Sequence, residues 1–137
     1  MTDQSHLDAN ILNDAADALI YSDRSGTITR WNRASAALFG FTADEALGQN
    51  LDLIVPEHLR AAHWKGFEAA LASGRMKLAG KPTLTRALHK SGRKLYIEMT
   101  FALVRESGGA VQGSVAMARD VTERVERERA ARQAQNS

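Results

Sequence analysis

The chain has 137 residues, of which 44% are hydrophobic and 25% are charged, so a single globular domain is expected. It has no apolar run that could span a membrane or act as a secretory signal, so we expect this domain to be cytoplasmic, without direct membrane insertion. It contains no cysteine, which excludes disulfides, thiolate zinc sites, thiol nucleophiles and thiol-adduct flavin photochemistry. The 18 Lys and Arg residues nearly balance 16 Asp and Glu residues and interleave with them along the chain, which argues against a nucleic-acid partner.

The first third of the chain predicts a helix, two strands and two short helices. Apolar residues at near-helical spacing favour a helix within residues 1–17. Ala18–Ser22 and Thr27–Trp31 are typical of two short strands joined by a turn. A short helix should follow at Asn32–Phe39, with Asn32 and Gly40 as its caps, and Thr42 with Glu45 forms a capping-box pattern that begins another.

A longer helix is predicted over Glu57–Ser73, with Gly74 as its C-cap. Residues at i, i+3, i+4, i+7 and i+8 spacing define one face of this helix, which we predict to comprise Leu59, Ala62, His63, Gly66, Phe67, Ala70 and Leu71. Trp64 should point off that face, to shield His63 or to form a dimer contact.

Three strands and an exposed charged helix complete the chain. The strands are predicted at Lys77–His89, Lys94–Val104 and Ala110–Arg119, and the helix at 122–137. Two strands, several small helices and three longer strands indicate an α+β fold, a five-stranded antiparallel sheet with short helices on one face. We therefore expect an N-terminal helical cap at 1–17, a core at 18–121 and an exit helix at 122–137.

The order of these elements and four segments resemble the PAS domain, a sensory module of bacterial signalling proteins. The segments are GTITRWNRASAALFGFTADEALGQNL, LIVPEHLRAAH, ALHKSGRKLYIEMTFALV and GSVAMARDVTERVERE, and the resemblance covers roughly residues 10–130. It implies the PAS fold and a role in signal transduction, with any catalytic activity in another domain or partner. The sequence also shows none of the common catalytic motifs, so we do not expect an enzyme.

His63 is the most informative candidate site residue. A histidine on an apolar helix face needs partners for its ring nitrogens when buried, and the small residues beside it, Gly66 among them, leave space. A neutral imidazole facing an aliphatic slot suits the iron of a haem. Moreover, Leu59 to His63 resembles the segment that carries the proximal histidine in haem-binding PAS oxygen sensors of the FixL and Dos types. That resemblance implies haem b with His63 as iron ligand, for gas or redox sensing.

The same resemblance places other residues around the haem. It puts Leu78, Met99 and Phe101 on the distal wall and Ala116 at a small position of the last strand. This chain departs from the pattern at Thr83, where FixL-type sensors carry a distal arginine, and at Lys81, where Dos-type sensors carry a methionine.

The resemblance also implies an output route and partners. Asp120 and Thr122 match the segment that couples the PAS core to the exit helix, although Thr122 is equally explained as a helix N-cap. We expect a homodimer and an effector such as a histidine kinase, a cyclic-dinucleotide enzyme or a chemoreceptor. Two alternatives to haem sensing stay open, namely a cofactor-free dimerisation and relay module, and a sensor of another small apolar ligand or a flavin.

Overall fold

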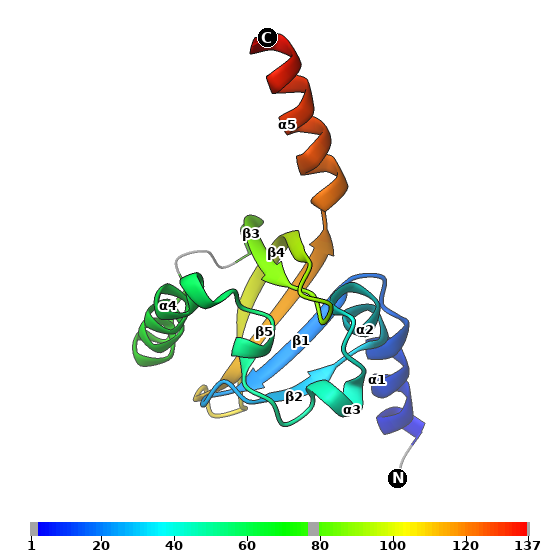
Figure 1. Cartoon of the computed structure of the whole chain (residues 1–137). Helices are drawn as coiled ribbons and strands as arrows, with labels where there is room; N and C mark the ends of the chain where they lie inside the picture. Colours follow the sequence, from blue (N-terminus) through cyan, green and yellow to red (C-terminus); the bar gives the residue numbers. More distant parts are fainter. Residues whose placement is uncertain (1–2, 77–79, 137) are drawn as a thin grey trace.

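The computed structural model describes residues 3–76 and 80–136 and consists of one antiparallel sheet, helices on one of its faces and a projecting C-terminal helix (Figure 1). The five strands lie in the order β2-β1-β5-β4-β3. Their bounds are β1 Ala18–Asp23, β2 Ile28–Trp31, β3 Thr83–Leu88, β4 Lys94–Arg105 and β5 Val111–Asp120. The helices are α1 Asp3–Asp14, α2 Arg33–Phe39, α3 Ala43–Ala46, α4 Arg60–Ser73 and α5 Thr122–Asn136, with 3₁₀ turns η1 Leu51–Leu53 and η2 Glu57–Leu59. The predicted α+β class, a five-stranded antiparallel sheet with helices on one face, is confirmed.

The core lies between the helices and the inner face of the sheet, meaning the face that the helices cover. Strand alternation decides which side chains reach it, because successive residues point to opposite faces. On β4 the residues Leu95, Ile97 and Met99 are buried while Tyr96 and Glu98 are half-buried on the outer face. Across the sheet, inner-face residues of β1, β2 and β5 join α2 and α3 in one hydrophobic cluster.

Asn32 ties the N-terminal part of the chain together. It is the N-cap of α2, and its Oδ1 accepts hydrogen bonds from Ser35 N and Oγ and from Leu19 N. Its Nδ2 donates to the carbonyls of Leu12 and Asp17. The side chain is 1% exposed, so these partners replace the water that a buried amide would otherwise lose. The predicted cap roles of Asn32, Gly40 and Thr42 are confirmed, each by its own backbone geometry.

One strand boundary differs from the prediction by more than one residue. We expected a strand from Lys77, but β3 begins at Thr83, and residues 77–79 lie outside the described part of the chain. Gly80 adopts φ +71, in the left-handed region, and Pro82 has no backbone N–H to donate to a neighbouring strand. These two residues delay the strand. Among the described helices none is long and apolar enough to cross a bilayer.

Candidate functional site

The candidate site is the side of α4 that faces the rest of the domain. Most of the predicted face is confirmed, because His63, Phe67, Ala70 and Leu71 are half-buried or buried on this side and Leu59 is half-buried in η2. Arg60 and Trp64, which the prediction left out, are also half-buried there. Ala62 and Gly66 lie on the exposed side, and a Cβ added to Gly66 would meet no atom within 4 Å. Gly66 therefore forms no wall beside His63, and its predicted place in a cofactor slot is corrected. Compared with the predicted face, the inward face of α4 is turned toward Trp64, because the indole ring is held by residues of other elements.

Trp64 is held by contacts that are distant in sequence. Its Nε1 donates a 2.7 Å hydrogen bond to the carboxylate of Asp52 in η1. Its ring packs on Gly26 in the β1–β2 turn, so closely that a Cβ at Gly26 would lie 2.6 Å from Cζ3. Gly26 has φ +82, a conformation that glycine adopts without strain. The predicted shielding of His63 by Trp64 agrees with their edge-to-face contact, with ring centroids 4.8 Å apart.

His63 lies between aromatic rings and has a buried nitrogen without a partner. Phe67, one turn along α4, stacks on it with centroids 6.0 Å apart and an interplanar angle of 30°. Its Nδ1 is buried and forms no hydrogen bond with any described residue. Burial lowers the pKa of His63 below the usual histidine value, and the nearby Asp52 carboxylate only partly opposes this. Burial thus favours the neutral imidazole, which is the form that binds a metal ion.

The lowered pKa gives a pH-dependent stability with a defined sign. Between the lowered folded pKa and the ordinary value near about 6.5, the unfolded chain binds more protons than the folded chain. The free energy of unfolding should therefore fall as the pH drops through the ordinary histidine range and level off below the folded pKa. Urea unfolding from about pH 8 to about pH 5 measures this decline, which His63→Gln should reduce. An equal decline in both chains would contradict the assignment to His63.

Three of the other predicted lining residues lie on β4 and β5. Met99 and Ala116 are 7% and 9% exposed in the inner-face cluster, and Phe101 pairs with Ala116 across the two strands and packs against that cluster. Phe101 also lines a hollow of about 600 Å³ that opens beside the C-terminal end of α4. The structure thus brings Met99, Phe101 and Ala116 to one inner surface. The fourth predicted lining residue, Leu78, lies outside the described residues.

Two contacts that the sequence did not reveal fasten α4 to the rest of the domain. Arg105, at the end of β4, donates hydrogen bonds to the carbonyl of Gly74, the C-cap of α4, and to that of Gly109. The carboxylate of Asp52 accepts the hydrogen bond from Trp64 and lies 4.0 Å from the guanidinium of Arg60. Neither Asp52 nor Arg105 belongs to a recognisable motif, and only the tertiary structure brings them to the helix.

The exit segment attaches α5 to β4. The carboxylate of Asp120 accepts the N–H of Thr122 at 2.9 Å. The Thr122 hydroxyl accepts the N–H of Tyr96 at 2.9 Å, and Val121 N donates to the Tyr96 carbonyl. The residue that precedes α5 is Val121, whose carbonyl accepts the first helical hydrogen bond, so the alternative of Thr122 as N-cap is wrong. Its hydroxyl instead fixes the exit helix to the sheet.

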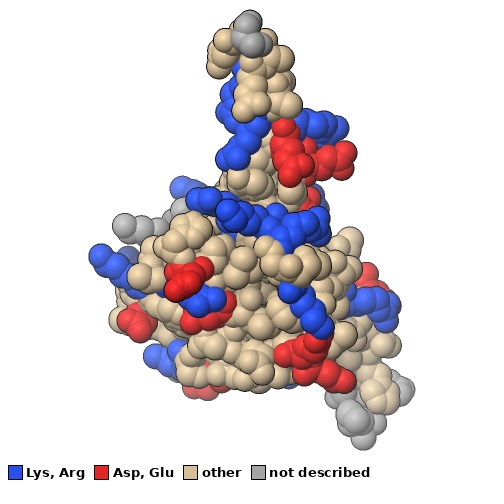
Figure 2. Space-filling model, in the orientation of Figure 1, with Lys and Arg blue, Asp and Glu red and all other residues tan. Residues whose placement is uncertain are grey.

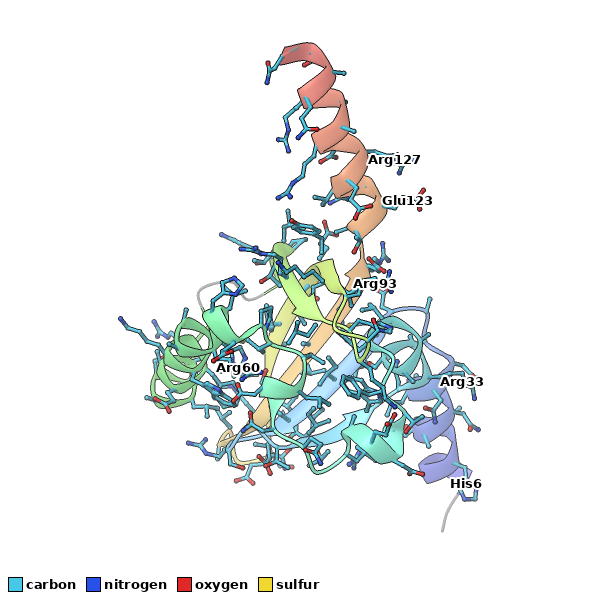
Figure 3. The ribbon with its side chains drawn as sticks, in the orientation of Figure 1. His6, Arg33, Arg60, Arg93, Glu123 and Arg127 are labelled. Atoms are coloured by element: carbon cyan, nitrogen blue, oxygen red, sulfur yellow. The ribbon has the colours of Figure 1, made fainter. Side chains whose placement is uncertain are left out.

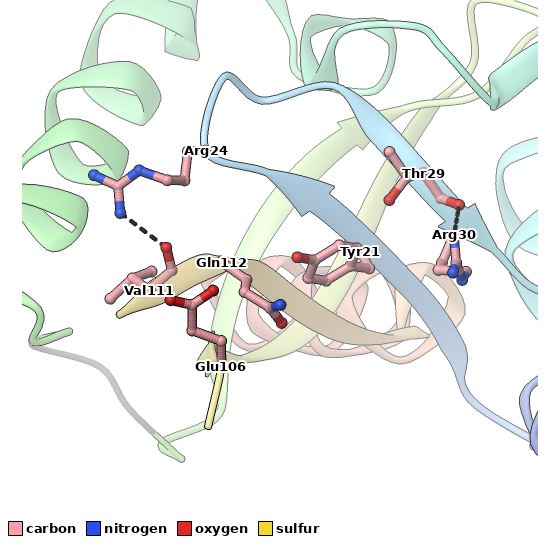
Figure 4. Close-up of a pocket in the computed structure, with 7 residues that line it drawn as sticks. All are labelled: Tyr21, Arg24, Thr29, Arg30, Glu106, Val111 and Gln112. Carbon is pink, nitrogen blue, oxygen red and sulfur yellow. Dashed lines mark hydrogen bonds between the residues drawn. The ribbon is translucent and has the colours of Figure 1, made fainter. Parts of the chain in front are cut away.

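A second, polar hollow lies on the outer face of the sheet (Figure 4). It measures about 680 Å³ and is lined by Tyr21, Arg24, Thr29, Arg30, Glu106, Val111 and Gln112. Both of its guanidinium groups already donate to backbone carbonyls, Arg24 to Val111 and Arg30 to Thr29. No group of three or more metal-binding side chains occurs here or elsewhere in the described chain. This hollow therefore offers no chemistry comparable with that around His63.

The sheet order, the helices on one face and the exit segment define the class of protein as a sensory module. The family model for the PAS fold matches residues 7–121, and the chain belongs to the PAS family. A crystal structure of a PAS domain from Colwellia psychrerythraea superposes with a TM-score of 0.75 at 22% identity, covering 88% of this chain and 99% of that one.

Two curated relatives are sensors. The sensor protein FixL of Bradyrhizobium diazoefficiens is 39% identical over 62 residues, covering 45% of this chain and 12% of the relative. The oxygen sensor protein DosP of Escherichia coli is 27% identical over 92 residues, covering 67% of this chain and 11% of the relative. The chain spans only a small part of the curated relatives it matches.

Proposed function

We propose that this PAS domain senses a gas or a redox change through a haem whose iron is bound by His63. The observation that carries the proposal is the buried, unpartnered nitrogen of a neutral imidazole on the inward face of α4. Metal coordination requires the neutral ring, which burial favours. Similarity to FixL and DosP, both described as sensors, supports the same reading.

The residues around His63 and on the inner face of the sheet have the chemistry that a haem needs. His63 would hold the iron, while Met99, Phe101 and Ala116 supply an apolar surface on β4 and β5. A haem, when bound, supplies an iron with a coordination position for a diatomic gas. Trp64 and Phe67 orient the imidazole by ring packing on two sides, and Asp52 holds Trp64 in place.

The route of the signal follows from the two ends of β4. Arg105 bonds the C-terminal end of α4, and Tyr96, about 30 Å away along an extended strand, bonds Thr122 at the start of α5. A displacement of α4 would move the strand, and Thr122 and Asp120 would pass that movement to the exit helix. The domain then has two states that differ in the positions of α4 and α5, and a ligand near His63 shifts the equilibrium between them.

Reconstitution with haemin tests the proposal. The chain should develop a Soret absorption band, and His63→Ala should lose it or weaken haem affinity by more than the roughly 10–100-fold that loss of an outer-shell partner of a metal ligand costs. His58→Ala is the matched control, because His58 is exposed in η2 and should leave the band unchanged. A Soret band equal in both variants, or absent from the parent chain, would refute haem ligation by His63.

A cofactor-free relay module is the second candidate. It is favoured by the packing of Trp64 and Phe67 around His63 and by the near-complete burial of Met99 and Ala116. The absorption spectrum of the purified protein separates the candidates. Haem gives a Soret band, a flavin absorbs in the blue, and an unliganded module or one with a colourless apolar ligand gives neither.

The proposed partners are a second copy of the chain and an effector. Leu84 and Met117 are 54% and 38% exposed on the outer face of the sheet, which gives two copies an apolar surface to share. The effector, such as a histidine kinase, a cyclic-dinucleotide enzyme or a chemoreceptor, would receive the signal from α5 in cis or in trans.

A further inference from the structure

A group of unpaired cations surrounds the place where α5 leaves the sheet. We define this junction patch as Arg86, Lys94, Arg129 and Arg132, all of them exposed. None of the four forms an ion pair with a described carboxylate. Other described cations do pair with acids, as Arg33 with Asp14, Arg119 with Asp17, Arg124 with Glu98 and Lys90 with Glu45.

The four cations gather around one ring, that of Tyr96. Arg86 is the partner of Tyr96 in the β3–β4 register, and Lys94 lies two residues before Tyr96 on the same face of β4. The guanidinium carbon of Arg129 lies 4.8 Å from the Tyr96 ring centroid, and Arg132 follows one turn later on α5. Figure 2 shows Lys and Arg side chains gathered where α5 meets the body.

The side of α5 that faces away from the patch carries charges of both signs. Glu123 and Arg127 project from the far side of α5 (Figure 3), and the neighbouring Glu126 and Glu128 are also exposed. The four cations of the patch lie beside two carboxylates that both pair with Arg124, namely Glu98, two residues after Tyr96 on β4, and Glu128 on α5. Like charges gathered on one surface repel each other, so an anionic partner would relieve a cost that the isolated chain bears.

We propose that the junction patch docks an acidic segment of a partner protein. Guanidinium groups bind carboxylates through paired hydrogen bonds, and arginine clusters recognise acidic motifs by this chemistry. Such a segment would contact β4 and α5 together, at the point where Thr122 fastens the helix to Tyr96. Its affinity would thus depend on the position of α5 relative to the sheet, whatever is bound near His63.

The surroundings of the patch favour a protein segment over other polyanions. The carboxylates of Glu98 and Glu128 repel a continuous polyphosphate, while a short peptide places a few carboxylates and avoids them. Arg129 covers the face of Tyr96 on which a nucleic-acid base would stack. Val125, the single large aliphatic residue of 122–137, is buried, so α5 offers no apolar anchor to a lipid surface.

Fluorescence anisotropy with a labelled oligoglutamate peptide tests the proposal on the full chain. The triple variant Arg86→Gln, Lys94→Gln, Arg129→Gln should bind about tenfold more weakly, since each exposed charge pair contributes up to about 1 kcal/mol. Binding should weaken when salt rises from about 50 mM to about 300 mM. The matched control Lys65→Gln, Arg75→Gln, Lys81→Gln removes the same charge from exposed positions outside the patch and should retain affinity.

The remaining outcomes oppose the proposal. Equal loss in both triple variants would show a non-specific charge effect, and no binding by the parent chain would also overturn it. Patch-dependent binding that is tighter to single-stranded RNA or to phosphatidylserine vesicles than to the peptide would assign the surface to another class of partner. Circular dichroism checks the fold, and if the triple variant unfolds, single Arg86→Gln and Lys94→Gln substitutions provide the same comparison.

Discussion

Replacing Asn32 by alanine should lower the free energy of unfolding by about 3–4 kcal/mol, because it breaks a buried network and leaves several backbone groups without partners. The side chain makes five hydrogen bonds that link α1, β1 and α2. Alanine satisfies none of them, and no water reaches a residue that is 1% exposed. Urea unfolding followed by far-UV circular dichroism measures the change.

Ser35, which is hydrogen-bonded to Asn32, provides the control substitution. Ser35→Ala removes one hydroxyl, which bonds Leu19 O and Asn32 Oδ1, and should destabilise the chain by only about 1 kcal/mol. The Asn32 variant should also expose the amides of α1 to hydrogen exchange, since Leu12 and Asp17 are both held by Asn32. Equal losses of stability in the two variants would contradict the central role of Asn32 in this hydrogen-bond network.

Substituting Gly26 by alanine should destabilise the domain by about 2–4 kcal/mol and displace Trp64. Part of the loss is the left-handed backbone at φ +82, which costs an L-residue about 1–2 kcal/mol. The rest arises because the new Cβ would overlap the Trp64 indole, which hydrogen-bonds Asp52 and cannot move without breaking that bond. Since Trp64 packs on His63, the substitution should also weaken any ligand bound through that histidine.

Gly48→Ala separates the two contributions. Gly48 has φ +86, nearly the same backbone conformation, but an added Cβ would meet no atom within 4 Å. It should therefore show the backbone cost without the steric one. The indole N–H signal of Trp64 in NMR spectra should shift in the Gly26 variant and stay in place in the Gly48 variant. Equal stability losses with no shift would contradict the packing of Trp64 on Gly26.

Local features of this chain were predictable because each depends on residues within one helical turn. The caps at Asn32, Gly40 and Thr42 follow from side-chain chemistry and left-handed glycine, and the alternation of a strand explains why Leu95, Ile97 and Met99 reach the core. The late start of β3 was missed, although Gly80 and Pro82 were visible as breakers. The family resemblance depended on the same local motifs.

The sequence by itself determined the order of the elements and, through the absence of cysteine, excluded thiol chemistry. Its choice of His63 as the candidate ligand stays a prediction. Only the tertiary structure decided how α4 is turned, because Asp52 and Gly26 hold Trp64 and thereby direct Gly66 to solvent. It also reversed the impression of evenly mixed charge. Cations that alternate with acids along the chain meet around Tyr96, because strand register and the attachment of Thr122 bring β3, β4 and α5 together.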